Sequence, residues 1–92
     1  MFVRELRDDI LALAHRHGAR NVRLFGSVAR GEANEESDID FLVDAGEETS
    51  PWFPAGLVDD LQKLLGRRVE VVTEDSLHWL LRRRILKEAR PL

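Results

Sequence analysis

The sequence contains no cysteine, and this absence excludes several kinds of chemistry at once. Disulfides, thiolate nucleophiles and zinc sites with cysteine ligands all require that residue. No apolar run approaches the roughly 18 residues that a membrane-spanning helix needs, and the first residues lack the pattern of a signal peptide. We therefore expect a cytoplasmic protein that does not contact a membrane.

A strong excess of basic residues is also lacking. The 92 residues include 14 Lys and Arg against 17 Asp and Glu, which gives a formal net charge of −3. Non-specific binding to duplex DNA depends on many basic contacts with phosphates, so no direct DNA binding is expected. The proportions of hydrophobic residues, 43%, and charged residues, 34%, are those of a globular protein, and the length predicts one domain over residues 1–92.

The spacing of the apolar residues predicts alternating helices and strands. The expected elements are a helix from residue 3 to near Gly18, a strand over 21–25, a helical turn over 27–30, a strand over 38–43, a helix over 57–65, a strand over 69–72, and a last helix capped by Asp75 or Ser76. The residues expected to be buried on the last helix are Leu77, Leu80, Leu81, Ile85 and Ala89. This order predicts an α/β (α+β) fold, with a small three-stranded mixed sheet and helices packed on one face.

Two aspartates lie within the second expected strand, which is otherwise apolar. Because side chains alternate across a strand, Asp38 and Asp40 share one face, and Ile39, Phe41 and Val43 share the other. Two carboxylates so close together repel each other unless a cation lies between them. Oxygen ligands without a neighbouring His or Cys favour Mg²⁺ or Mn²⁺ over zinc. The pattern therefore predicts a metal site, although an Asp-x-Asp alone is often only a solvated strand edge.

A glycine and a serine follow the first expected strand, and this position suits a phosphate group. Gly26 allows a close approach of the backbone, and Ser27 adds a hydroxyl group. The amide groups that begin the turn over 27–30 would carry a partial positive charge, which favours anions. A Gly-Ser pair between a strand and a turn is usually only a turn, so it is the combination with the two aspartates that indicates function.

The spacing of these two features resembles a known signature. Gly26-Ser27, ten intervening residues and Asp38-Ile39-Asp40 are similar to the motif of the DNA polymerase β-like nucleotidyltransferases. The strings "GSVARGEANEESDIDFLV" and "LLGRRVEVVTEDSLHWLLRRRILKEARPL" resemble the minimal nucleotidyltransferases of that superfamily. The resemblance implies a nucleotidyltransferase fold and transfer of AMP from ATP to a tyrosine of a HEPN-domain toxin, for which such proteins act as antitoxins.

The resemblance also implies roles for particular residues. Two aspartates and a third carboxylate on a later strand would hold two divalent ions, Mg²⁺ or Mn²⁺, and these correspond to Asp38, Asp40 and Glu70. Most members have aspartate where this chain has Glu70, whose reach is on the order of 1 Å longer, and a shift of that size can lower a rate about 10²-fold. The nucleotide-binding residues would be Gly26, Ser27, Arg30 and Ser37. From the residues alone, Arg30 could equally contact a phosphate or pair with the site carboxylates.

Two hypotheses follow. In the first, the chain is a nucleotidyltransferase whose acceptor is delivered by a partner protein, because the chain has no second domain to bind an acceptor. In the second, it neutralises its partner by binding alone, with a site that is vestigial or only binds nucleotides, and Glu70 keeps this alternative open. Trp52 and Phe53 lie in a loop between prolines, where large aromatic side chains either fold back on the core or contact a partner. We expect the latter.

Overall fold

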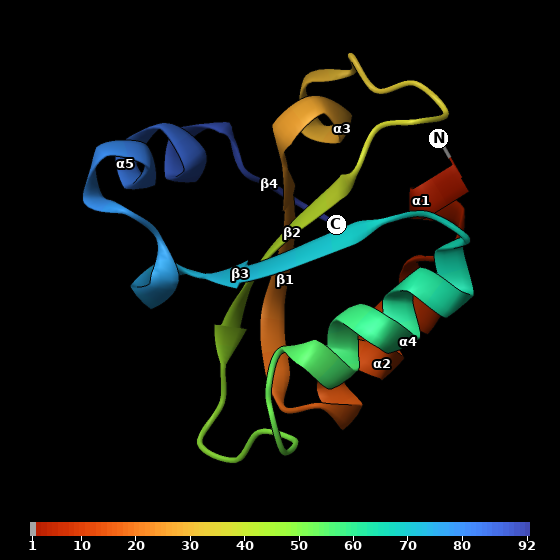
Figure 1. Cartoon of the computed structure of the whole chain (residues 1–92), viewed down its shortest axis with the longest axis vertical. Helices are drawn as coiled ribbons and strands as arrows, with labels where there is room; N and C mark the ends of the chain where they lie inside the picture. Colours follow the sequence, from red (N-terminus) through yellow and green to blue (C-terminus); the bar gives the residue numbers. More distant parts are fainter. Residues whose placement is uncertain (1) are drawn as a thin grey trace.

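A four-stranded mixed sheet forms the centre of the structure, in the order β3–β2–β1–β4 (Figure 1). This computed structural model describes the backbone of residues 2–92 and the side chains of residues 3–92. The strands are β1 (Ala19–Phe25), β2 (Ile39–Ala45), β3 (Val69–Thr73) and β4 (Arg90–Pro91). Strand β2 is parallel to β3 and antiparallel to β1, and β4 is antiparallel to β1. The predicted mixed sheet is therefore confirmed, but its strand number is four and not three.

The fourth strand has only two residues, and one of them is a proline. Arg90 and Pro91 pair with Leu24 and Arg23 of β1. The next residue, Leu92, donates a backbone hydrogen bond to the carbonyl of Val22 at 3.2 Å, and its side chain is buried in the core. A segment this short has no periodicity to detect, and proline is rare inside strands. The sequence pattern therefore could not predict β4.

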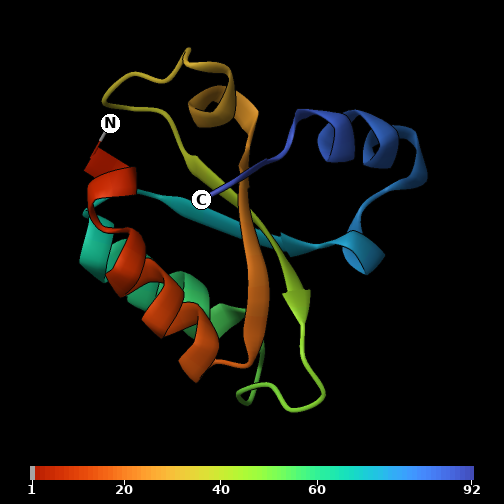
Figure 2. The ribbon, with the colours of Figure 1, turned by 180° about the vertical axis from the view of Figure 1, so that it is seen from behind.

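Two helices cover one face of the sheet. They are α2 (Arg7–Arg16) and α4 (Ala55–Leu65), which lie side by side (Figures 1 and 2). A short helix, α1 (Phe2–Glu5), precedes α2, so the expected first helix is interrupted at Leu6. Helix α4 ends as predicted, because Gly66 adopts the left-handed conformation with φ of 65° that commonly terminates helices.

The core lies between these helices and the sheet. Ile39, Phe41 and Val43 of β2 face it and have almost no exposed surface, as the alternation predicted. Leu57 and Leu61 of α4 pack into the same cluster. Burying each such side chain stabilises the fold by about 1.5–3 kcal/mol, which holds β2 in register and so determines where its other face points.

The last helix lies outside this core. Helix α5 (Trp79–Glu88) has no buried residue and lies on the other side of the sheet from α2 and α4 (Figures 1 and 2). It packs against the short helix α3 (Gly26–Arg30). The prediction of a buried stripe on this helix is therefore wrong, because α2 and α4 already fill the core-facing side of the sheet.

The start of α5 also differs from the expectation. Neither Asp75 nor Ser76 caps it, because residues Glu74–Ser76 form a separate 3₁₀ turn, η1. His78 is the capping residue, and its Nδ1 accepts a hydrogen bond from the backbone N–H of Leu80 at 3.2 Å. Among residues 2–92, no helix has both the length and the apolar character needed to cross a bilayer.

Candidate active site

Three predicted site residues lie at one end of the central strands. Asp38 directly precedes β2, and Asp40 is the second residue of that strand. Asp40 is in register with Glu70 of the parallel strand β3. Register partners on neighbouring strands share a face, so the two carboxylates lie on the same side, opposite the buried Ile39. The predicted placement of Glu70 on the face of Asp40 is therefore borne out by the sheet register.

The environment of Asp40 disfavours its negative charge. Its pKa is raised from the usual 3.8 to about 6. Burial of the carboxyl group is the largest cause. The negative charge of Glu70, a side-chain hydrogen bond with Glu70 and the negative charge of Asp38 follow, whereas the positive charge of Arg30 acts in the opposite direction. A carboxylate with this balance of neighbours is stabilised by an added cation.

Gly26 contacts the same carboxylate. It has a φ of +74°, and a Cβ atom placed on it would lie 2.2 Å from Oδ2 of Asp40. Only glycine adopts this backbone conformation without strain and also leaves room for the aspartate. Gly26 begins α3 directly after β1, so the glycine of the predicted phosphate turn lies against the predicted metal ligand. Gly31, which ends α3, also has a φ of +74° but has no neighbouring atom within 4 Å of such a Cβ.

The donor atoms of the site suit a hard divalent cation. Asp38, Asp40 and Glu70 offer only carboxylate oxygens, the ligands that Mg²⁺ and Mn²⁺ prefer. However, no three His, Cys, Asp or Glu side chains among the described residues are arranged as a ready ligand group. The expectation of three converged carboxylates is therefore not met in this conformation, although Asp40 and Glu70 lie close enough for their interaction to raise the pKa of Asp40. The residues fit such an ion in chemistry and in strand position.

Arg30 and Ser37, the other two residues expected to bind the nucleotide, contact residues outside the carboxylate group. Arg30 forms ion pairs with Glu32, at 2.7 Å, and with Glu88 of α5. It forms no ion pair with a site aspartate among the described residues, although its charge acts on Asp40 from a distance. The hydroxyl group of Ser37 lies 3.3 Å from Oδ1 of Asn34, within the loop before β2. Ser27 directly follows Gly26, the glycine that contacts Asp40, at the start of α3.

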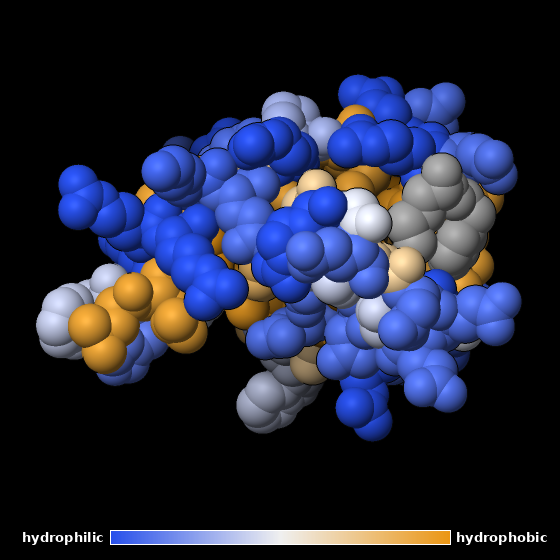
Figure 3. Space-filling model, turned by 90° about the horizontal axis from the view of Figure 1, so that it is seen from above, coloured by the Kyte–Doolittle hydropathy of each residue, from blue (hydrophilic) through white to orange (hydrophobic). Residues whose placement is uncertain are grey.

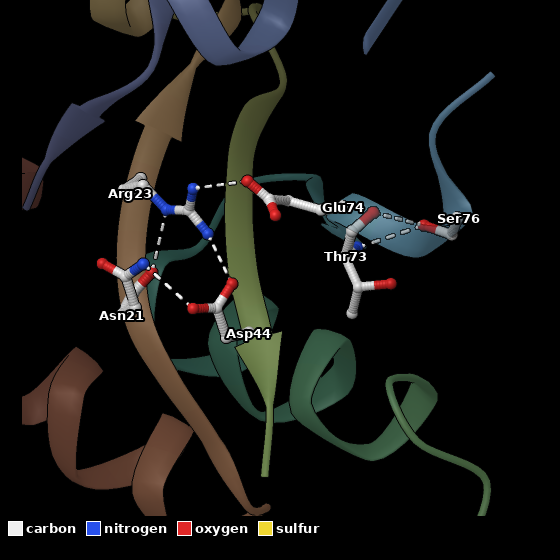
Figure 4. A network of polar contacts seen from close by, with 6 residues as sticks. All are labelled: Asn21, Arg23, Asp44, Thr73, Glu74 and Ser76. Atoms are coloured by element: carbon white, nitrogen blue, oxygen red, sulfur yellow. Dashed lines mark hydrogen bonds and ion pairs between the residues drawn. The ribbon is translucent and has the colours of Figure 1, made fainter. Parts of the chain in front are cut away.

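The opposite end of the same sheet face provides a contrast (Figure 4). There Arg23 of β1 donates to Asp44 of β2 at 2.8 Å and lies 3.5 Å from Glu74 of η1. Asn21 also donates to Asp44, at 3.0 Å. An arginine thus balances the two carboxylates at this end. Among the described residues, no arginine or lysine forms an ion pair with Asp40, so the candidate site lacks the balance seen at this end.

The structure shows a second polar group that sequence reasoning missed. His17 is largely buried, and its Nδ1 and Nε2 lie 2.7 Å from Oγ of Ser50 and Oδ2 of Asp60. These contacts tie the end of α2 to the following loop and to α4. Hydrogen bonding with His17 is the main reason that the pKa of Asp60 is lowered.

The two aromatic residues of the loop before α4 lie in different environments. Phe53 packs against the hydrophobic core, whereas the side chain of Trp52 is 89% exposed. The prediction that both residues contact a partner therefore remains only for Trp52, because Phe53 packs within the fold.

The fold and the candidate site agree with the comparisons with known proteins. Residues 3–92 match the model of the nucleotidyltransferase domain family. The chain therefore belongs to this family and is a nucleotidyltransferase. Its resemblance to the minimal nucleotidyltransferases is also confirmed, because a solved structure described as a minimal nucleotidyltransferase superimposes with a TM-score of 0.85 and 49% identity, over 98% of this chain and 92% of the other.

Curated relatives have similar lengths. A chain assigned as a protein adenylyltransferase in Methanocaldococcus jannaschii is 42% identical over 89 residues, which cover 97% of this chain and 96% of the relative. The protein adenylyltransferase MntA of Thermococcus cleftensis is 42% identical over 76 residues, 83% of this chain and 77% of MntA. A toxin–antitoxin structure with AMP-PNP shares the fold, with a TM-score of 0.77 and 23% identity over 91% of this chain and 69% of that one.

Proposed function

We propose that this chain transfers AMP from ATP to a hydroxyl group, that of a tyrosine, on a HEPN-domain toxin and thereby acts as its antitoxin. The observation that carries the proposal is the meeting of Asp40 with Glu70 on one side and Gly26 on the other. Support for a protein acceptor comes from the relatives named protein adenylyltransferases, and support for a toxin partner comes from the toxin–antitoxin structures that share the fold.

Each site residue has a role in this reaction. Asp38, Asp40 and Glu70 would hold two magnesium ions, or manganese ions, and Gly26 and Ser27 would bind the phosphates of ATP. Magnesium supplies charge neutralisation for the phosphates and lowers the pKa of an acceptor hydroxyl. The acceptor oxygen attacks the α-phosphorus, the bond from this phosphorus to the leaving oxygen breaks, and pyrophosphate departs. Glu70, which is exposed at the edge of the site, is placed to receive the proton from the acceptor.

The roles of Arg30 and Ser37 require movement. The ion pairs of Arg30 would have to open before its guanidinium could reach a phosphate, and Ser37 would have to leave its contact with Asn34. We therefore assign nucleotide contacts first to Gly26 and Ser27, and place Arg30 and Ser37 as residues that join when ATP binds.

A second function, neutralisation by binding alone, is favoured by one observation. The carboxylates are not arranged as a ready metal group among the described residues, and Glu70 is longer than the aspartate implied by the family resemblance. In that case the chain would bind its partner without modifying it.

Co-expression with a candidate HEPN-domain toxin from the same genome distinguishes the two functions. The intact mass of the purified toxin should increase by whole AMP units when the wild-type chain is present, and Asp40→Asn should abolish the increase. Tandem mass spectrometry would then identify the modified residue. A toxin that stays unmodified, yet copurifies equally with wild type and Asp40→Asn, would establish the binding function instead.

A further inference from the structure

A basic groove adjoins the candidate active site on the side of α5. Its volume is about 720 Å³. The residues that line it are Arg30, Leu80, Arg83, Arg84, Lys87 and Glu88. Apart from Arg30, these lie on α5 at the three- and four-residue spacing of one helix face. The groove is thus formed by one face of α5 and the end of α3.

The charges of the groove are not balanced within the molecule. Glu88 pairs with Arg30, which leaves Arg83, Arg84 and Lys87 without an acidic partner among the described residues. This surplus of positive charge occurs in a chain whose formal net charge is −3. A cluster of unpaired cations on an acidic protein attracts a group of opposite charge more strongly than the rest of the surface does.

The first turn of α5 adds an apolar end to the groove. The side chains of Trp79, Leu80 and Leu81 are 76%, 64% and 49% exposed. Apolar surface gathers at this side of the molecule, next to strongly hydrophilic residues (Figure 3). Exposed apolar residues in a row, bordered by charge, are typical of a surface that binds another protein.

The groove continues toward the candidate active site. A smaller cavity of about 180 Å³ shares Arg30, Arg84 and Glu88 with it. That cavity is also lined by Phe25 and Gly26, and Gly26 contacts Asp40. A chain that occupies the groove would therefore reach the residues that hold the reacting phosphate.

We propose that this groove binds an acidic segment of the acceptor protein and so holds the acceptor hydroxyl beside Asp40. The inference rests on the proposed function, because it assumes a protein acceptor. Acidic side chains on the segment pair with Arg83, Arg84 and Lys87, and an apolar residue contacts Leu80. This arrangement explains why α5 projects apolar and basic side chains that the fold itself does not use.

Fluorescence anisotropy with labelled probes tests the groove. The main probe is a short peptide in which a tyrosine and a leucine are flanked by glutamates, and the matched probe has glutamine at each glutamate position. The wild-type chain should bind the acidic peptide and not the glutamine peptide. Binding should disappear at about 1 M salt, where the screening length falls to about 3 Å.

Charge reversal on α5 provides matched variants. The double variant Arg83→Glu/Arg84→Glu should weaken binding of the acidic peptide by about tenfold or more. Arg82→Glu is the control, since Arg82 is exposed on the same helix but does not line the groove, and it should weaken binding less than about threefold. Thermal melting should be unchanged in all of them, because α5 has no buried residue.

Several results would overturn the proposal. These are unchanged binding by the double variant, equal losses in the double variant and Arg82→Glu, and equal binding of both peptides. Tighter binding of an oligouridylate RNA, lost in the double variant, would assign the groove to RNA. A wild-type chain that sediments as a dimer and becomes monomeric with Leu80→Ser would assign it to a second copy.

The transfer assay separates this proposal from the proposed function. If the double variant adds AMP to the toxin at the wild-type rate, docking in the groove is wrong and the transferase activity stands. If the acidic peptide binds through Arg83 and Arg84 but the toxin never gains AMP, the groove stands and the transferase proposal fails.

Discussion

Replacing Asp40 by asparagine should stabilise the protein when no metal is present. The pKa of Asp40 is 3.8 in an unfolded chain and about 6 in the folded one, because of burial, Glu70 and Asp38, with Arg30 opposing them. The folded state therefore holds this proton to higher pH than the unfolded state does. Stability is unaffected below the unfolded pKa, falls as the pH rises through the folded pKa, and stays lower above it.

The magnitude follows from the shift. About two pKa units at 1.36 kcal/mol each give an upper limit of about 3 kcal/mol. Because Asp40 is only half-buried, solvent screening reduces this penalty, and we expect about 1 kcal/mol. For a protein of this size, that corresponds to an increase in Tm of about 4–8 °C for Asp40→Asn at about pH 7.5. Near pH 3, where Asp40 is largely protonated in both the folded and the unfolded state, the increase in Tm should vanish.

Thermal melting in EDTA at the two pH values measures this effect. Asp8→Asn is the control, because the side chain of Asp8 is 97% exposed and should give no comparable gain. Added Mg²⁺ should raise the Tm of wild type and not that of Asp40→Asn, since a ligand stabilises only the state that binds it. An equal gain for Asp40→Asn at both pH values would refute the electrostatic explanation, and a wild-type Tm indifferent to Mg²⁺ and Mn²⁺ would refute the metal site.

Three further predictions concern the site and the neighbouring loop. Gly26→Ala should lower stability by about 1–2 kcal/mol in thermal melting and abolish AMP transfer to the toxin, measured by toxin mass. Gly31→Ala has the same φ but open space around the added Cβ, so it should lose stability from backbone strain alone and retain transfer. Equal activities of the two alanine variants would show that the contact of Gly26 is dispensable. Glu70→Gln should lose nearly all transfer activity, while calorimetry should still detect ATP binding. The transfer rate of Glu70→Asp shows whether the site has adapted to the longer side chain. Equal activity of Glu70→Gln and wild type would remove Glu70 from the reaction. Phe53→Ser should lower the free energy of unfolding by about 2 kcal/mol in urea titrations, because the partly buried Phe53 packs against the core. Trp52→Ser should leave that free energy unchanged and weaken the complex with the toxin, and a large loss of stability in this variant would contradict the assignment of Trp52 to the surface.

The central part of the fold could be predicted because it depends on local rules. Alternation along β2 separates Ile39 and Phe41 from Asp40, and the core then holds that strand in one register. Glycine endings were equally readable, since Gly31 and Gly66 both terminate helices in the left-handed conformation. These features follow from spacing and backbone geometry alone.

The parts that escaped prediction depend on distant contacts. The partners of His17 lie 33 and 43 positions away in the sequence, so nothing beside it indicates that it is buried. The apolar residues of α5 have the spacing of a buried stripe, but spacing alone does not show whether other helices already cover the sheet face that such a stripe would pack against. The ion pair of Arg30 with Glu88 is another distant contact, since the two residues lie 58 positions apart in the sequence.

The two ends of one sheet face show where the fold leaves a requirement unmet. At one end Asp44 is balanced by Arg23, so that end contributes to stability without any added group. At the other end Asp40 lies beside Glu70 in register, and Arg30, whose positive charge acts on Asp40, forms ion pairs with other carboxylates. Both ends share the same strands, so their difference does not come from the fold but from the side chains placed on it. Local penalties that persist in an otherwise consistent structure are typical of functional positions, because the missing interaction is supplied by a ligand.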